Sequence, residues 1–186
     1  FTLALLNGLI GFFDDYTKLI KKQNQGFLAW QKLVLQILVA VAYLWAMSAC
    51  GFIDTALEIP YFDIELELGI FYYFFAVLFI AGMGNSVNLT DGIDGLASSV
   101  TLVVACAFML GSGFLYTYTT NVLAGAMAGA CVGFICWNAH PAKVFMGDTG
   151  SLSLGAVMGA IAILTHRELT LLVVASIFII ETLSVI

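Results

Sequence analysis

Residues 28–50 read LAWQKLVLQILVAVAYLWAMSAC, an apolar run in which Lys32 is the only charged residue. An α-helix rises about 1.5 Å per residue and the hydrocarbon core of a bilayer is about 30 Å thick, so about 20 such residues cross a membrane. The run contains neither proline nor glycine. It therefore predicts one membrane-spanning helix.

Similar runs recur along the chain. Of its 186 residues, 62% are hydrophobic and 10% are charged, which lies far outside the range of soluble domains. We expect spans or part-spans at residues 1–13, 28–50, 69–87, 96–116, 121–137, 151–164 and 169–186, the sixth being tilted, re-entrant or longer. The predicted fold class is all-α, a polytopic membrane helix bundle of about seven spans or part-spans in a single domain, 1–186. Because the sequence starts without Met and stops inside an apolar run, we expect a fragment truncated at both ends.

Lysine predicts which side of the membrane each connection faces. With strict alternation, connections 14–27, 88–95 and 138–150 share one side, and connections 51–68, 117–120 and 165–168 share the other. The first set and its flanks hold all five lysines, whereas the second holds only Arg167. Positive charge favours the cytoplasmic side, so we expect the first set to be cytoplasmic.

Three further patterns concern structure rather than chemistry. Residues 56–67, ALEIPYFDIELE, alternate apolar and acidic residues in their later part, which predicts a small periplasmic β-hairpin without chemistry. Gly125, Gly129 and Gly133 have the spacing that lets helices approach closely, with an oligomer contact as a further reading. The four cysteines show no metal-ligand spacing, so buried free thiols are expected.

Polar residues concentrate in three patches of the predicted cytoplasmic connections: DDYTK at 14–18, NSVNLTDGIDG at 85–95 and NAHPAKVFMGDTGS at 138–151. Because alternate connections converge at one end of a bundle, the patches bring five aspartates to one membrane face: Asp14, Asp15, Asp91, Asp94 and Asp148. Their mutual repulsion would be costly unless a cation neutralised it. Oxygen ligands without thiols favour Mg²⁺ over Zn²⁺, and a divalent ion beside lysine and glycine suits a diphosphate.

Simpler interpretations exist for single residues. Aspartates near span ends, such as Asp14, Asp94 and Asp148, are often helix caps. We interpret His140 as a structural loop residue, and Phe145 either as core or as a ring that stacks on a base. Glu181 lies deep in the last predicted span, where an ionisable group indicates a function.

The three patches, taken as residues 14–18, 85–97 and 141–152, resemble the motifs of the polyprenyl-phosphate N-acetylhexosamine-1-phosphate transferases of glycosyltransferase family 4. The tyrosine and lysine after the aspartate pair, and Asn88-Leu-Thr, resemble the muramoyl-pentapeptide branch. The resemblance implies a ten-helix, often dimeric enzyme of the bacterial inner (cytoplasmic) membrane with its active site on the cytoplasmic face. It implies transfer of phospho-MurNAc-pentapeptide from UDP-MurNAc-pentapeptide to undecaprenyl phosphate, giving lipid I and UMP for peptidoglycan synthesis; no nucleic acid is involved.

The resemblance also implies residue roles. Asp148 would bind Mg²⁺, with Asp14 and Asp15 at the acceptor or the diphosphate, and these three are the catalytic candidates. Lys18 and Lys32 would meet phosphate. The uridine and sugar-phosphate pocket would be lined by Asn88, Leu89, Asp91, Gly92, Asn138 and Phe145, with Asp94 nearby.

Several alternatives stay open. One of Asp14 and Asp15 deprotonates the acceptor phosphate, or the pair forms an aspartyl phosphate. A sister enzyme would use UDP-GlcNAc, and a cation-coupled transporter would place its acids near the bilayer midplane, as at Glu181. The family's histidine-rich motif is not in the sequence, so we expect the chain as given to be inactive.

Overall fold

A computed structural model of the chain describes residues 1–22, 26–59, 62, 64–115 and 118–185, which form eight helices and one two-stranded sheet. The elements are α1 (Thr2–Lys21), α2 (Ala29–Ala49), β1 (Ala56–Ile59), β2 (Ile64–Glu67), α3 (Ile70–Thr90), α4 (Leu96–Leu115), α5 (Tyr118–Asn138), α6 (Gly147–Leu164), α7 (Glu168–Val174) and α8 (Ser176–Val185). Within the described residues, α2, α3, α5 and α6 are each long and apolar enough to span a membrane. The predicted all-α membrane helix bundle is confirmed.

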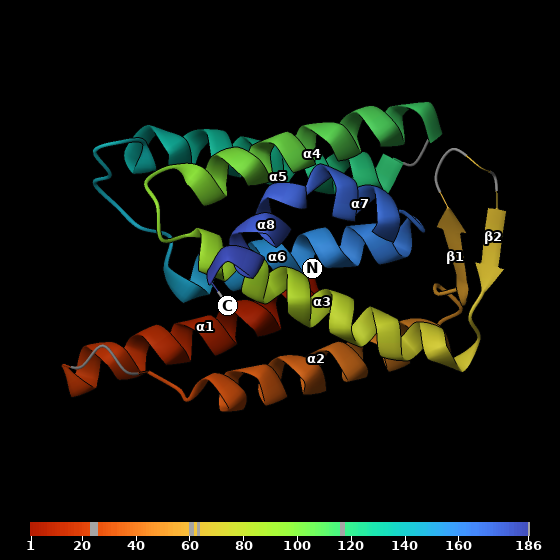
Figure 1. The fold of residues 1–186 in the computed structure, drawn as a ribbon, viewed down its shortest axis with the longest axis horizontal. Coiled ribbons are helices and arrows are strands. Elements are labelled where there is room, and N and C mark those ends of the chain that lie inside the picture. The colour runs from red at the N-terminus through yellow and green to blue at the C-terminus, as the bar shows by residue number, and fades with distance from the viewer. Residues whose placement is uncertain (23–25, 60–61, 63, 116–117, 186) are drawn as a thin grey trace.

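The helices are arranged so that alternate connections gather at the same end of the bundle (Figure 1). The chain leaves α1, α3 and α5 at one end, where α2, α4 and α6 begin, and the hairpin lies at the opposite end. Helix α6 lies between α1 and α3, while α4 and α5 pack together as a separate pair. The three polar patches therefore meet at the end opposite the hairpin, and we call this the polar end.

The predicted hairpin is confirmed. Strands β1 and β2 pair antiparallel, with Ala56 opposite Glu67 and Ile59 opposite Ile64. Residues 60, 61 and 63 of its predicted turn lie outside the described residues. Arg167, in the turn between α6 and α7, bonds Glu58 at 2.9 Å and so ties the hairpin to the helix bundle.

Several helices extend beyond the predicted spans. Helix α1 continues past residue 13 to Lys21, α3 continues to Thr90, and α6 begins at Gly147 rather than at residue 151. The apolar criterion identifies the part of a helix that crosses hydrocarbon, not the end of its hydrogen-bonded backbone. Charged residues thus continue α1, aided by an ion pair between Lys18 and Asp14 one turn apart.

The last predicted span, 169–186, is wrong as a single helix. It consists of α7 and α8, with Ala175 between them at φ −90° and ψ 17°. No proline or glycine marks the break, but Ala175 and Phe178 are fully buried, so packing against the bundle accounts for it. The predicted end points 116 and 186 lie outside the described residues.

Glycines bring α6 into backbone contact with two neighbours. A Cβ on Gly11 of α1 would overlap the carbonyl of Asp148, and one on Gly155 would lie 2.5 Å from the Cα of Gly84 on α3. Only glycine allows such close approach. The Gly11 contact places the first turn of α6 against the middle of α1, one turn before the aspartate pair.

Two other packing expectations are corrected. Within the described residues, a Cβ on Gly129 or Gly133 would meet nothing within 4 Å, and one on Gly125 would meet only the side chain of Met109 at 3.8 Å. Gly129 and Gly133 therefore bring no described helix close, because both lie on an exposed face of α5. All four cysteines are free, as expected, but only Cys131 is buried.

Candidate active site

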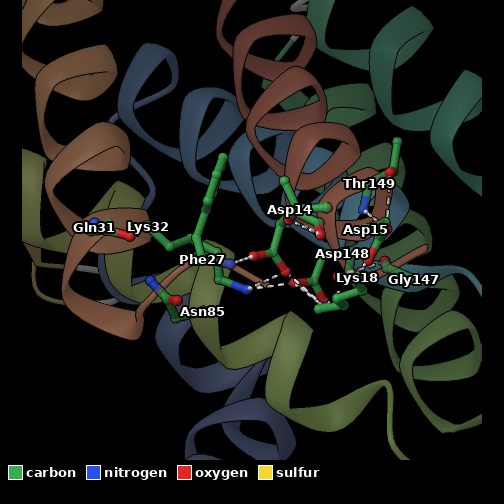
Figure 2. Close-up of polar contacts among 12 residues, drawn as sticks. Asp14, Asp15, Lys18, Phe27, Gln31, Lys32, Asn85, Gly147, Asp148 and Thr149 are labelled. Atoms are coloured by element: carbon green, nitrogen blue, oxygen red, sulfur yellow. Dashed lines mark hydrogen bonds and ion pairs between the residues drawn. The ribbon is translucent and has the colours of Figure 1, made fainter. Parts of the chain in front are cut away.

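Three carboxylates from two helices meet at the polar end. Asp14 and Asp15 lie late in α1 and Asp148 lies in the first turn of α6, and one oxygen of each carboxylate lies within 4.8 Å of the others. The side chain of Asp14 is 3% exposed and that of Asp148 is 15% exposed. Figure 2 shows the three side chains directed toward one another. We call this set the acidic cluster.

Two lysine ammonium groups contact the acidic cluster. Lys18 Nζ lies 2.7 Å from Asp14, 3.1 Å from Asp148 and 3.4 Å from Asp15. Lys32 Nζ, from α2, lies 2.6 Å from Asp148 and 3.9 Å from Asp14. The repulsion among three acids is thus offset in large part by two cations of the same chain (Figure 2).

The two adjacent aspartates of α1 have different partners. Asp14 Oδ1 accepts a hydrogen bond from the backbone N–H of Phe27, and a Cβ on Gly26 would overlap the Asp14 carboxylate. The segment that enters α2 thus closes over Asp14. The other oxygen, Oδ2, faces both lysines.

Asp15 instead caps α6. Its Oδ2 accepts hydrogen bonds from the backbone N–H of Thr149 at 3.2 Å and from the Thr149 hydroxyl at 3.1 Å. Gly147 has φ +66°, and a Cβ there would lie 2.8 Å from the same oxygen. A carboxylate at a helix N-terminus satisfies free N–H groups and opposes the helix dipole. A capping role therefore belongs to Asp15, supplied from a neighbouring helix.

Asp91 lies beside the acidic cluster. It follows Thr90 as the C-cap residue of α3, and its carboxyl group interacts with the backbone of Gly147. Its pKa is raised to about 6, mainly by burial, with a smaller contribution from the negative charges of Asp148 and Asp15, and the Gly147 backbone partly opposes the rise. Asp91 is a fourth acid at the polar end.

Asp94 lies apart from the acidic cluster and joins two connections. Its Oδ2 pairs with His140 Nδ1 at 3.0 Å and accepts the backbone N–H of Ala142 at 3.0 Å. These hydrogen bonds lower the pKa of Asp94. The contact agrees with the structural interpretation of His140.

Asn138 joins the same two connections from the end of α5. Its Oδ1 accepts the backbone N–H of Gly95 at 3.1 Å and the hydroxyl of Ser98 at 3.0 Å, and its Nδ2 donates to the carbonyl of Val144 at 2.9 Å. Both side-chain polar atoms thus bond protein groups. Its predicted contact with a nucleotide stays a prediction.

The remaining predicted substrate residues lie on the surface of the polar end or just beneath it. Leu89 is 42% exposed and Phe145 is 58% exposed, so the core interpretation of Phe145 is wrong. Gly92 is exposed as well. Asn88 is half-buried, and its Nδ2 is buried without a hydrogen-bond partner among the described residues. Their predicted contacts with substrate remain predictions.

Sequence reasoning assigned no role to a pair of amides below the acidic cluster. Asn85 Nδ2 of α3 donates to Gln36 Oε1 of α2 at 2.7 Å. Asn85 belongs to a polar patch, but Gln36 lies inside the apolar run 28–50. The available signal was its position four residues after Lys32, on the same helix face. Glu181, in contrast, is half-buried, and within the described residues its carboxylate has no hydrogen bond or ion pair.

The donor set fits a hard divalent cation. Three carboxylates converge, and no cysteine or histidine among the described residues joins them. Carboxylate oxygens suit Mg²⁺, whereas structural Zn²⁺ sites use mainly thiolate and imidazole. The polar end can therefore hold a cation and, through its two lysines, the phosphate groups of a ligand.

Comparison with known proteins identifies the family. The model of glycosyl transferase family 4 matches residues 1–166. Proteins named phospho-N-acetylmuramoyl-pentapeptide-transferase are similar to nearly the whole chain. That of Heliobacterium modesticaldum is 45% identical over 99% of this chain and 58% of its own length, and that of Shouchella clausii is 46% identical over 96% and 55%. The chain thus spans somewhat more than half the length of these curated relatives, and it belongs to glycosyl transferase family 4.

Proposed function

We propose that the chain carries the catalytic centre of a Mg²⁺-dependent phospho-MurNAc-pentapeptide transferase in the bacterial inner membrane. The reaction transfers phospho-MurNAc-pentapeptide from UDP-MurNAc-pentapeptide to undecaprenyl phosphate and gives lipid I and UMP. The observation that carries the proposal is the acidic cluster with Lys18 and Lys32 at one end of a membrane helix bundle. The names of the relatives, at 42% to 46% identity, support the choice of donor.

The position of the acidic cluster favours an enzyme over a transporter. The acids lie at the end of the bundle where the chain leaves α1 and enters α6. A lipid phosphate head group is found at such a depth, whereas a transported cation is bound near the midplane. The lysine distribution supports a cytoplasmic location for this end, the side on which the nucleotide substrate is found.

Mg²⁺ held at Asp148 would polarise the diphosphate of the donor. Lys18 and Lys32 neutralise the negative charge of the phosphate groups. They are in position to do so because both ammonium groups lie beside the Asp148 carboxylate. Asp14 takes the proton of the acceptor phosphate through Oδ2, while Asp15 keeps α6 in place through Thr149. The acceptor oxygen then attacks the β-phosphate and UMP leaves.

UMP release from UDP-MurNAc-pentapeptide tests the proposal, measured on the intact protein in detergent with undecaprenyl phosphate, with and without Mg²⁺. We expect Mg²⁺-dependent release that Asp148→Asn abolishes. Asp54→Asn, which changes an acid near the hairpin, serves as the matched control and leaves release unchanged. Turnover of UDP-GlcNAc alone would assign the protein to the sister branch, and no turnover of either donor would reject the proposal.

A further inference from the structure

Gln36 and Asn85 connect two helices just below the acidic cluster. Gln36 is 1% exposed, and its Oε1 accepts a hydrogen bond from Asn85 Nδ2 at 2.7 Å. Asn85 Nδ2 also donates to the carbonyl of Ala81 at 2.8 Å, which holds the Asn85 side chain against its own helix. The pair therefore ties α2 to a fixed point on α3.

Packing alone does not explain an amide at position 36. Gln36 Nε2 is buried and has no hydrogen-bond partner among the described residues. Burying an unpaired polar group is unfavourable, more so in a membrane span, where water is not available to satisfy it. Leucine would fill a similar volume without that cost. Gln36 therefore serves a purpose other than filling space.

The position of the pair indicates that purpose. Gln36 follows Lys32 by one turn on the same face of α2, and the Lys32 ammonium group lies 2.6 Å from Asp148. A Cβ on Gly84 would lie 3.7 Å from Gln36 Nε2 and 3.9 Å from Leu152, which follows Asp148 by one turn on α6. Gln36 thus lies where α2, α3 and α6 meet. Figure 2 shows Asn85 on the Lys32 side of the acidic cluster.

We infer that Gln36 and Asn85 are positioning residues that fix the rotation of α2 and so hold the Lys32 ammonium group at Asp148. Lysine has a long flexible stem, so the direction of its helix face decides which carboxylate it reaches. The inference rests on the proposed function, since it assigns Lys32 a role in transfer. The inference gives Gln36, an uncharged residue inside an apolar span, a role in positioning Lys32.

A second hydrogen bond between the same helices supplies the control. Ser48 of α2 and Tyr73 of α3 are joined at 2.8 Å near the opposite end of the bundle. Ser48→Ala removes an α2–α3 hydrogen bond, as Gln36→Leu does, but far from Lys32. Ser48→Ala is expected to lower thermal stability, whereas Gln36→Leu also removes the unpaired Gln36 Nε2 and is expected to change thermal stability less. Only Gln36→Leu is expected to alter the site.

The test is a double-mutant cycle on kcat/KM with Gln36→Leu, Lys32→Met and both together, in the intact protein. We expect Gln36→Leu to lower kcat/KM about tenfold in the otherwise unchanged protein, the usual order for one buried hydrogen bond, and less than about twofold when Lys32 is Met. Ser48→Ala leaves kcat/KM unchanged in both backgrounds. A Gln36→Leu effect that is undiminished without Lys32, or equalled by Ser48→Ala, would overturn the inference.

Cation binding gives a readout that does not depend on turnover. Lys32 competes with a cation for Asp148, so Lys32→Met and Gln36→Leu each tighten Mn²⁺ binding, by about threefold, and the double variant tightens it no further. Mn²⁺ binding is followed by electron paramagnetic resonance. An unchanged Mn²⁺ affinity in Gln36→Leu would reject the inference, whether the donor is UDP-GlcNAc or no donor is turned over. Failure of UMP release with the expected Mn²⁺ result rejects only the proposed function.

A variant that exchanges the two amides distinguishes loss of the Gln36–Asn85 contact from misfolding. Gln36→Asn combined with Asn85→Gln keeps one amide on each helix and the same combined length. We expect its kcat/KM to exceed that of either single substitution. A doubly substituted protein with wild-type thermal stability but no recovery of kcat/KM would also overturn the inference.

Discussion

The two ends of the bundle each contain a buried acid, and the two acids differ in their surroundings. Asp14 at the polar end is 2% exposed and faces Lys18, Lys32 and a backbone N–H. Glu168 at the hairpin end is 0% exposed and accepts a hydrogen bond from Tyr72, while its Oε2 has no partner among the described residues. The Asp14 carboxylate, which lies among cations, can exchange a lysine for another cation. The Glu168 carboxyl group, which is bonded to a single hydroxyl, instead joins two helices. The difference distinguishes the candidate active site from a structural contact.

The largest expected effect separates the two adjacent aspartates of the polar end, Asp14 and Asp15. Asp14→Asn should lower kcat by about 10³-fold, since it removes the proposed base. Asp15→Asn should lower kcat less and should lower stability by about 0.5 kcal/mol, because an amide oxygen can still accept the Thr149 hydrogen bonds but the negative charge at the N-terminus of α6 is lost. Initial rates of UMP release and thermal unfolding distinguish the two. Equal losses of kcat in both variants would contradict the division of roles.

Removing a cation should affect turnover and metal binding in opposite directions. Lys18→Met should lower kcat/KM by about 10²-fold, because a charge-assisted contact to phosphate is lost. It should tighten Mn²⁺ binding, because the ammonium group no longer competes for three carboxylates. Lys22→Met, at the exposed end of α1, is the control. Weaker Mn²⁺ binding in Lys18→Met would show that the lysine supports the cation instead.

At the hairpin end, the same kind of substitution should change stability and not chemistry. Tyr72→Phe leaves both oxygens of Glu168 without a hydroxyl donor and should cost about 1 to 3 kcal/mol of unfolding free energy. The kcat of the folded protein should not change. Denaturation in detergent and initial rates are the measurements. If kcat fell although the Tyr72→Phe protein was fully folded, the hairpin end would also take part in the reaction.

The smallest expected effect concerns Asp91. Burial raises its pKa to about 6 from 3.8, so the folded protein binds more protons than the unfolded chain between these values. Stability should therefore fall as pH rises from about 4 to about 6, by about 1 kcal/mol after allowance for solvent screening. Thermal unfolding of wild type and Asp91→Asn, without divalent ions, should show a steeper fall in wild type than in the variant, in which only other buried acids such as Glu168 still titrate. A matching slope in the variant would assign the titration to another group.

Much of the fold could be predicted because it depends on local properties of the chain. Apolar length alone located α2 to within a residue at each end, and alternation located the hairpin. The parity of the spans also brought Asp14, Asp15 and Asp148 to one end. The break at Ala175 and the outward face of Gly129 could not be predicted, because each depends on which other helix lies opposite.

The sequence by itself determined that the chain is a membrane helix bundle, which residues carry charge and which motifs it shares with its family, because hydropathy and residue order need no partner to be recognised. Only the tertiary structure decided that Asp15 caps α6, that Asp94 joins two connections instead of the acidic cluster, and that Gln36 meets Asn85. These assignments depend on contacts between residues far apart in the chain. The physical reason is that a carboxylate or an amide has the same chemistry wherever it stands, and its neighbours in space decide whether it caps, joins or reacts.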